Sequence, residues 1–328
     1  MTPKPIVILG PTAVGKSRVA VRVAEALDGE IISADSRQIY QGMEIATAKP
    51  GPEMMARVPH HLINVVQPDQ IFSAGQYREM AEPIIFRLQD QGKTPVIVGG
   101  TGLYLRALLQ GLWSGPRAQW DLRHQFVEEE RTFGSGYLHQ RLAKVDPEAA
   151  FRIHPRDQVK IIRALEVAFT TGVSLTQHHE EHTPKAWMTE SLTIGLRRDR
   201  EDLYHRINCR VDEMVCSGLV GEVERLLSLG YDSDLPSMRG LGYRQVVGYL
   251  RGLHSLEEAI RLIKRDTRRY AKRQMTWFRK EPEVQWVDLK SGDQDDPIIE
   301  KVLARIQSVK GETGFSKIAL AARSSNPL

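Results

Sequence analysis

The residues best suited to chemistry stand near the start of the chain, in the segment Gly10-Pro11-Thr12-Ala13-Val14-Gly15-Lys16-Ser17. Two glycines with four residues between them, followed by Lys and a hydroxyl residue, fit the phosphate-loop pattern. In such a loop backbone N–H groups and a helix start converge on an anion, and Lys16 adds a mobile positive charge. Ser17 is placed to hold Mg²⁺. The segment therefore predicts a site for a diphosphate or triphosphate, without indicating which bond of the ligand breaks.

The elements around this segment favour a phosphate loop over an ordinary glycine-rich turn. The apolar run Ile6–Leu9 predicts a buried strand, and Arg18–Leu27 carries apolar residues at helical spacing. The glycines therefore fall where a strand turns into a helix. This is the context that the pattern requires.

Asp35 follows a second predicted strand, Glu30–Ala34, with Ser36, Arg37 and Gln38 in the loop beyond. The carboxyl ends of strands in an open α/β sheet face the ligand, which favours a functional role for Asp35. The alternative is a turn former, a common use of Asp. Lys49, in the polar loop that follows, is expected to be solvated.

A third strand, Thr94–Val98, ends in Gly99-Gly100-Thr101-Gly102 and leads into a helix over Leu103–Leu109. Small residues there allow the backbone and the Thr101 hydroxyl to approach a ligand closely, although a tight packing turn would use the same glycines. A nucleotide hydrolase usually ends such a strand with a magnesium-holding acid. No acid follows Val98.

The alternation of strand and helix patterns stops between Trp113 and Glu190, where several helical patterns follow one another. The sequence therefore predicts an α/β protein with a P-loop-type parallel sheet core flanked by helices and an inserted all-helical domain. The expected boundaries are a first part of the core at 1–112, the insertion at 113–190, a second part of the core with basic helices at 191–309, and a disordered tail at 310–328.

Composition is consistent with a globular protein: 41% of the 328 residues are hydrophobic and 26% charged, with a net charge of +4. No signal peptide or membrane-spanning stretch is expected, so we predict a cytoplasmic protein without a membrane partner. Cys209 and Cys216 are interpreted as core thiols. His60–Val65 is predicted to be a short strand, and the tract from His178 to His182 a solvated turn; in both, metal binding is the weaker alternative.

The second half rejoins the sheet. Ser191–Arg197 predicts a returning strand, and Asp199 can cap a helix that runs to Ser217. On that helix Arg206 and Arg210 share a face, from which they could reach phosphate or form surface ion pairs. The glycine-broken segment from Met238 to Gln245 is expected to be a loop that clamps a nucleic-acid backbone.

The strongest electrostatic signal is the segment Arg261–Lys280, which carries nine basic residues and one acid. At helical spacing Arg261, Arg265, Arg268 and Lys272 form one face, and apolar and aromatic residues fall roughly opposite. We expect this basic ridge to face a polyphosphate backbone, with a generic basic surface as the alternative. Beyond it, Val284–Val287 is expected to be an edge strand, and Asp295-Asp296-Pro297 to begin a last helix.

Ordered blocks from residue 5 to 290 together resemble one family, the tRNA dimethylallyltransferases. The blocks are Gly10–Ser17, Ser33-Ala34-Asp35-Ser36-Arg37-Gln38-Ile39-Tyr40, Thr47-Ala48-Lys49-Pro50, Gly99-Gly100-Thr101-Gly102-Leu103-Tyr104, His154-Pro155-Arg156-Asp157, Arg163-Ala164-Leu165-Glu166, Gly240-Leu241-Gly242-Tyr243-Arg244-Gln245 and Lys272-Arg273-Gln274-Met275-Thr276-Trp277-Phe278-Arg279. The resemblance implies transfer of a dimethylallyl group from dimethylallyl diphosphate to N6 of adenosine 37, beside the anticodon, in tRNAs that read codons beginning with U. With only two cysteines and no zinc-finger extension, it implies a bacterial-type enzyme, which we expect to act as a monomer.

The resemblance also implies roles for individual residues. The phosphate loop, Gly10 to Ser17, would hold the donor diphosphate with Mg²⁺ at Ser17, and Lys16 and Arg210 would neutralise the leaving group. Asp35 would accept the N6 proton, and Thr101 would hydrogen-bond near the reacting centre. The positions that match the family's tRNA contacts are Asp35, Ser36, Arg37, Gln38, Thr101, Arg123, Gln158, Val159, Lys160, Ile161, Ile162, Arg239, Gly240, Leu241, Gly242, Tyr243 and Arg244.

Three other functions fit parts of the sequence: a P-loop nucleotide kinase, an adenosine-phosphate prenyltransferase and a non-enzymatic RNA-binding protein. The basic segment near the end argues against the first two. The third would leave the phosphate loop, Asp35 and Thr101 without a purpose at one sheet edge.

Overall fold

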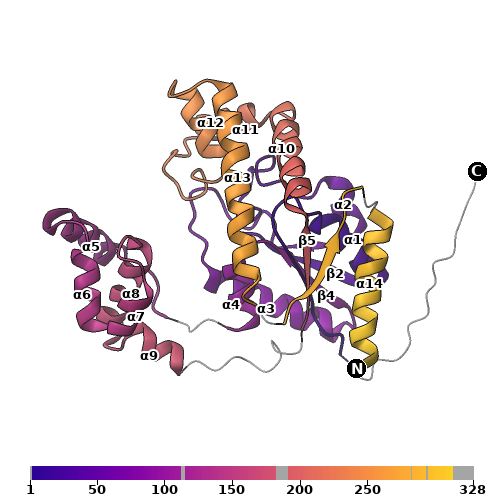
Figure 1. The fold of residues 1–328 in the computed structure, drawn as a ribbon, viewed down its shortest axis with the longest axis horizontal. Coiled ribbons are helices and arrows are strands. Elements are labelled where there is room, and N and C mark those ends of the chain that lie inside the picture. The colour runs from indigo at the N-terminus through magenta and orange to yellow at the C-terminus, as the bar shows by residue number, and fades with distance from the viewer. Residues whose placement is uncertain (1, 112–114, 182–190, 282, 293–294, 313–328) are drawn as a thin grey trace, which may run out of the picture. The chain divides into compact units, whose positions relative to one another are not determined.

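The fold is built around a parallel sheet of six strands in the order β3-β2-β4-β1-β5-β6. Figure 1 shows the ribbon, with β2, β4 and β5 of this sheet labelled. The computed structural model describes residues 2–111, 115–181, 191–281, 283–292 and 295–312. The strands are β1 Ile6–Leu9, β2 Gly29–Ala34, β3 His60–His61, β4 Thr94–Gly99, β5 Leu192–Arg198 and β6 Gln285–Leu289. This confirms the predicted α/β class, with β6 as the edge strand expected near residue 285.

The chain forms two compact units, one from Met1–Leu108 with Glu190–Leu328 and the other from Leu109–Thr189. The sheet belongs to the first unit. Its helices are α1 Lys16–Ala26, α2 Pro52–Arg57, α3 Ala74–Asp90, α4 Gly102–Leu109, α10 Arg200–Cys216, α11 Leu219–Ser228, α12 Tyr243–Leu250, α13 Leu256–Phe278 and α14 Asp295–Glu312.

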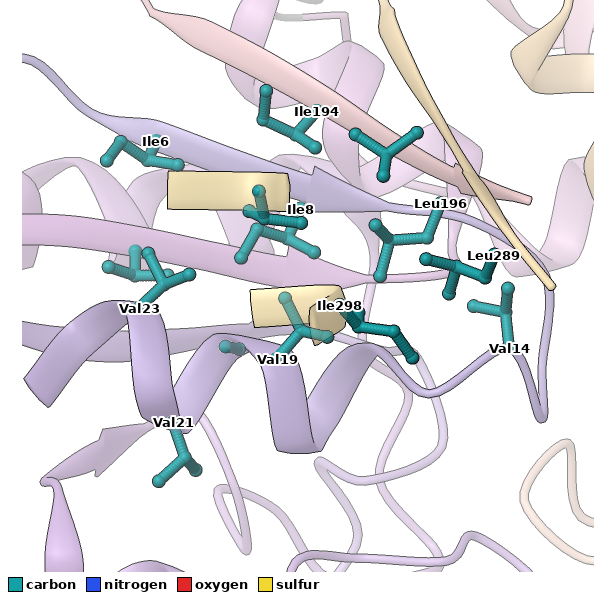
Figure 2. Close-up of a cluster of buried hydrophobic side chains, with 14 of the residues drawn as sticks. Ile6, Ile8, Val14, Val19, Val21, Val23, Ile194, Leu196, Leu289 and Ile298 are labelled. Carbon is teal, nitrogen blue, oxygen red and sulfur yellow. The ribbon is translucent and has the colours of Figure 1, made fainter. Parts of the chain in front are cut away.

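The core of the first unit lies between the sheet and its helices (Figure 2). Ile6 and Ile8 of β1 pack with Val19 and Val23 of α1, and every residue of β1 is buried. A strand buried on both faces reads as a continuous apolar run, which is why Ile6–Leu9 could be found from the sequence. Val14 of the phosphate loop belongs to the same cluster, so the loop is anchored in the core.

The register of the central strands brings three loops to one edge of the sheet. Leu9 of β1 lies opposite Gly99 of β4, and Gly99 lies opposite Ala34 of β2. Because the strands are parallel and end at the same level, the segments that begin at Gly10, Asp35 and Gly100 leave the sheet side by side.

The second unit is helical, as its sequence patterns predicted. Its helices are α5 Trp120–Phe133, α6 Tyr137–Val145, α7 Pro147–Arg152, α8 Gln158–Thr171 and α9 Leu175–Glu180. They enclose a core of their own that includes Phe126, Leu138, Leu142 and Leu165. Asp157 caps α8, its carboxylate accepting the Lys160 N–H, and Gly172 ends the helix in a left-handed conformation.

Several local expectations were wrong. The strand expected over His60–Val65 ends at His61, because Leu62 and Asn64 adopt positive φ and turn the chain. His178 and His179 lie in α9, begun by the Ser174 cap, instead of a turn. His182 lies outside the described residues.

Both cysteines are exposed, not core thiols. Cys209 stands two positions after the buried Ile207 on α10. Two positions correspond to about 200° around a helix, so Cys209 lies on the side away from the core. At the end of the chain α14 continues to Glu312, past the expected start of the tail at 310, and 313–328 lie outside the described residues. Among the described helices, none is long and apolar enough to cross a membrane.

Candidate active site

The phosphate loop connects β1 to α1 through two glycines in conformations that side chains disfavour. Gly10 has φ 151°, and a Cβ there would lie 2.5 Å from the Leu196 carbonyl oxygen. Gly15 has φ 110° and precedes α1, which starts at Lys16, two residues before the expected Arg18. The N–H groups of Lys16 and Ser17 therefore belong to the first helical turn, where no intrahelical acceptor exists.

The Lys16 side chain folds back over this loop. Its ammonium group donates to the carbonyl oxygens of Gly10 and Pro11, at 2.9 and 2.8 Å. The pKa of Lys16 is lowered to about 8, mainly by burial; the Asp35 carboxylate opposes this shift and Arg210 adds to it. An ammonium group with a lowered pKa in a buried site is stabilised by an incoming anion.

Three arginines reach the loop from the end of β5 and from α10. Arg198 and Arg206 donate to the carbonyl oxygens of Val14 and Ala13, each at 3.1 Å, and Arg210 reaches the Thr12 hydroxyl at 3.4 Å. Burial lowers the pKa of Arg210, and the nearby Asp35 opposes this shift. Asp199 caps α10, as predicted, and so sets the direction in which the helix presents these side chains.

Asp35 and Thr101 stand on the adjacent loops. The Thr101 hydroxyl accepts the Ser36 N–H at 3.0 Å, and the Asp35 carboxylate accepts the Arg37 N–H at 2.8 Å. These contacts fix the turn after β2. Asp35 therefore forms a turn, as the alternative interpretation expected, and also lies in the candidate site. Together with burial, the charge of Asp35 raises the pKa of Tyr270 on α13 to about 12.

A cavity of about 1170 Å³ opens over this edge of the sheet. The phosphate loop, Asp35 and Arg210 line it, together with Gly100 and Tyr270. A volume of this size exceeds that of a small diphosphate and leaves room for a second substrate group. All its lining residues belong to the first unit.

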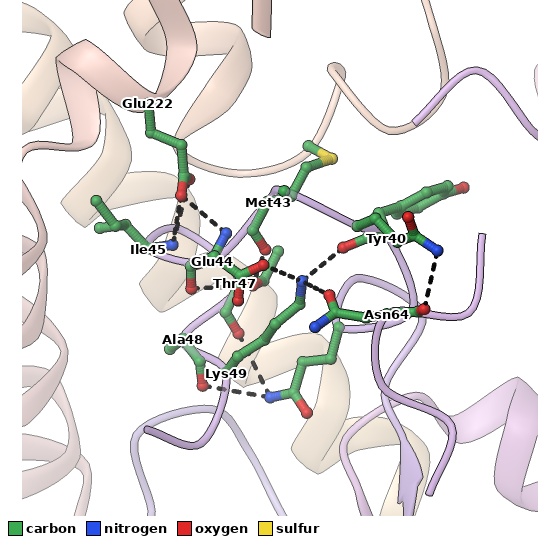
Figure 3. Close-up of polar contacts among 12 residues, drawn as sticks. Tyr40, Met43, Glu44, Ile45, Thr47, Ala48, Lys49, Asn64 and Glu222 are labelled. Carbon is green, nitrogen blue, oxygen red and sulfur yellow. Dashed lines mark hydrogen bonds and ion pairs between the residues drawn. The ribbon is translucent and has the colours of Figure 1, made fainter. Parts of the chain in front are cut away.

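The loop after Gln38 is held by a polar network around two buried side chains, those of Glu222 and Lys49 (Figure 3). Glu222 of α11 accepts the N–H groups of Glu44 and Ile45 at 2.8 and 2.9 Å. Lys49 is not solvated: its side chain is 3% exposed, and it donates to the Tyr40 carbonyl oxygen, Glu44 and Asn64. Sequence reasoning missed Glu222, because the loop residues that it binds, Glu44 and Ile45, lie 178 and 177 positions away and no local pattern marks it.

The segment from Arg239 to Arg244 lines the same cavity, but only part of it is a loop. Tyr243 begins α12, and its buried hydroxyl donates to Glu222 at 2.8 Å, so this side chain supports the fold and cannot serve as a clamp. Arg239 and Arg244 are exposed. Gln38 is engaged within the protein, where its amide oxygen accepts from Ser33 and its amide nitrogen donates to the Ala48 carbonyl oxygen.

In the second unit, Arg123 forms a two-point ion pair with the fully buried Glu166, at 2.8 Å for each contact. Ile161 and Ile162 of α8 are buried in the unit's core, so their side chains are not available to RNA. Gln158, Val159 and Lys160 are exposed on the first turn of that helix.

The basic ridge of α13 is only partly as expected. Ile263, Ala271 and Gln274 are buried on the inner face. On the other face, Arg268 is half-buried and donates to Asn208 at 2.6 Å, and Arg265 pairs with Asp266 at 2.9 Å. Arg261 is exposed and pairs with Glu258, and Lys272 is exposed.

A parallel α/β sheet that gathers a glycine-rich loop, several cationic side chains and a carboxylate at one edge is typical of proteins that bind a polyphosphate beside a second substrate. Within this class, the sequence profile of the IPP transferase family matches residues 38–281. The chain belongs to the IPP transferase family.

Relatives and solved structures agree with this assignment. The chain is 50% identical over 285 residues to the tRNA dimethylallyltransferase of Geobacter sulfurreducens, covering 87% of this chain and 92% of that protein. It is 51% identical, over the same length and with the same coverage, to tRNA dimethylallyltransferase 2 of Geotalea uraniireducens.

Among solved structures, the tRNA isopentenylpyrophosphate transferase of Bacillus halodurans is similar with a TM-score of 0.69 and 41% identity, over 95% of this chain and 99% of that one. A eukaryotic dimethylallyltransferase described as acting on tRNA is similar with a TM-score of 0.81 and 25% identity, over 97% of this chain and 82% of that one.

Proposed function

We propose that this chain transfers the dimethylallyl group of dimethylallyl diphosphate to N6 of adenosine 37, next to the anticodon, in tRNAs that read codons beginning with U. The observation that carries the proposal is the convergence of Lys16, Arg210 and Asp35 on one cavity, close enough for Asp35 to influence the pKa of both cations. The names of the relatives support the choice of donor and acceptor.

In the proposed reaction, the bond from N6 to the allylic carbon forms as the bond from that carbon to the diphosphate oxygen breaks. Negative charge grows on the leaving diphosphate, where Lys16 and Arg210 stabilise it. The amine nitrogen becomes positive as it bonds, and its proton passes to the Asp35 carboxylate. Thr101 keeps the Asp35 turn in place through the Ser36 N–H.

Mg²⁺ fits the site through Ser17. Magnesium commonly keeps several waters and takes only one or two protein oxygens besides substrate phosphates. Ser17 supplies one hydroxyl in the first turn of α1 and lines the cavity. When bound, the ion would neutralise part of the charge on the diphosphate.

The tRNA would be held by side chains that line the cavity, such as the half-buried Arg37 and the exposed Arg239 and Arg244. The target base is stacked in its loop, so it must be flipped out to reach Asp35. We propose that the chain acts as a monomer in the cytoplasm.

The test is mass spectrometry of nucleosides from tRNA incubated with the protein, dimethylallyl diphosphate and Mg²⁺. We expect N6-(dimethylallyl)adenosine at position 37. Adenosine monophosphate offered instead of tRNA should give no product. Product from the monophosphate alone would favour the adenosine-phosphate prenyltransferase, and steady release of phosphate from ATP would favour the kinase.

A further inference from the structure

Gln274 links α13 to two loops of the candidate site. Its amide oxygen accepts the Thr12 N–H at 2.9 Å, and its amide nitrogen donates to the Gly100 carbonyl oxygen at 2.7 Å. The side chain is buried, with 7% of the residue exposed. A buried amide that satisfies groups on two separate loops fixes their separation, because moving either loop leaves a polar group without a partner.

Gly100 is shaped for this contact. A Cβ at position 100 would lie 2.4 Å from the Gln274 amide nitrogen, closer than any normal contact. Glycine at this position therefore makes room for Gln274. This gives Gly100 a role that the junction's glycine-rich sequence did not reveal.

The contact also removes a donor from the phosphate loop. Pro11 has no N–H group, and the Thr12 N–H is directed to Gln274. The Val14 N–H is directed to the Pro11 carbonyl oxygen at 3.4 Å, so the N–H groups that remain for a ligand lie at Ala13 and in the first turn of α1. Pro11 and Thr12 thus offer no free backbone donor to a ligand. Each further phosphate of a ligand needs donors of its own.

We propose that Gln274 is a positioning residue that holds the phosphate loop in a form suited to a diphosphate and not to a triphosphate. The proposal rests on the proposed function, in which the donor is a diphosphate, and assigns part of that selectivity to the loop itself. Gln274 acts through Thr12 and Gly100 and touches no reacting atom.

The test uses the full chain with Mg²⁺ and measures the dissociation constants of inorganic diphosphate and inorganic triphosphate by calorimetry, for the free protein and for the protein saturated with tRNA. We expect the parent to prefer diphosphate by about tenfold or more. Gln274→Met, which frees the Thr12 N–H while keeping the side-chain volume, should reduce this preference about fivefold, the effect of one gained hydrogen bond. Gly100→Ala should act in the same direction by displacing the amide.

Two further variants distinguish a positioning role of Gln274 from a nonspecific loss of ligand binding. Gln274→Glu retains an acceptor for the Thr12 N–H but loses the donor to Gly100, so the preference should stay within about twofold of the parent while both ligands bind more weakly. Gln89→Met is the matched control, because Gln89 of α3 likewise donates from a helix to a backbone carbonyl, that of Pro3 at 2.9 Å, outside the cavity lining. It should change neither constant.

The proposal is overturned if the parent binds triphosphate as tightly as diphosphate, or if Gln274→Met and Gly100→Ala both keep the parent's preference. Should Gln274→Met fail to fold, as judged by its thermal unfolding, Gly100→Ala and Gln274→Glu decide the question. Failure of the proposed function would look different: the nucleoside assay would give no prenylated product, whereas the preference for diphosphate and its loss in the variants would remain.

Discussion

At the scale of single residues, the site depends on charges that are held close together inside a cavity. Lys16 and Arg210 are both half-buried cations whose pKa is lowered by burial, and the charge of Asp35 opposes this shift. Such a group of opposed charges can accept an anion on one side and a proton on the other. The two predictions at this scale test proton acceptance by Asp35 and anion binding by Lys16.

Replacing Asp35 with Asn should lower the single-turnover rate of transfer to tRNA by about 100-fold or more, because a positioned base is lost. Binding of dimethylallyl diphosphate should change little. Rapid-quench measurements on Asp35→Asn check this, with the exposed Asp90→Asn as control. A rate within threefold of the parent would restrict Asp35 to its turn.

The affinity for dimethylallyl diphosphate should fall as the pH rises through 8. Lys16 has a pKa lowered to about 8, so it is charged below that pH and loses its proton above it. The diphosphate favours the charged form, so at pH 9 binding must include proton uptake and should be about tenfold weaker than at pH 7. Calorimetry in buffers of different ionisation enthalpy measures the proton uptake directly. Lys16→Met should bind dimethylallyl diphosphate weakly, and its affinity should not change with pH near 8. If the affinity of this variant still falls near pH 8, another group is responsible for the titration.

At the scale of elements, α13 presents different residues on two faces. Its inner face provides Tyr270 and Gln274 to the cavity, and its exposed face carries basic residues that we expect to contact a nucleic-acid backbone. Arg268 is half-buried, and its guanidinium group donates to Asn208, so it is less available to a nucleic acid than the exposed basic residues. The structure thus distinguishes among basic residues that looked equivalent in sequence.

Replacing Lys272 and Lys280 together with Ala should weaken tRNA binding and flatten the log–log dependence of affinity on salt by about 1.5 units, the contribution of two phosphate contacts. Both lysines are exposed. Filter binding across a range of salt concentrations measures the slope, and Arg268→Ala serves as the comparison because its side chain is engaged with Asn208. An unchanged slope in the double variant would place the RNA on another surface.

At the scale of the whole molecule, the chain consists of two units with separate hydrophobic cores. The sheet unit contains every residue that lines the cavity. The helical unit is stabilised by its own apolar cluster and by buried Glu166, which is paired with Arg123 and Arg163. A defect in one core should therefore remain in that unit.

Replacing the fully buried Phe126 with Ala should lower the free energy of unfolding of the helical unit by about 3–5 kcal/mol, the cost of truncating a core Phe. Hydrogen exchange followed by mass spectrometry on the full chain checks this. Amides of α5, α6 and α8 should exchange faster, whereas those of β1, β4 and α1 should keep the parent's rates. Faster exchange throughout the sheet would show that the two units unfold together.

The sequence by itself determined the features that depend on neighbours along the chain. The phosphate loop, the apolar strands and the cap at Asp199 are local, because each is set by a few consecutive residues and the backbone geometry they prefer. The family resemblance rested on such blocks as well. The parallel sheet followed from the alternation of strands and helices.

Only the tertiary structure decided which polar side chains are buried and what they hold. The contact between Thr12 and Gln274 joins residues 262 positions apart, and Glu222 meets Glu44 across 178 positions. No local pattern distinguishes these residues from solvated ones, as the mistaken expectation for Lys49 illustrates. The reason is physical: burial of a polar group is stable only when distant partners satisfy its hydrogen bonds, and the fold alone brings those partners together.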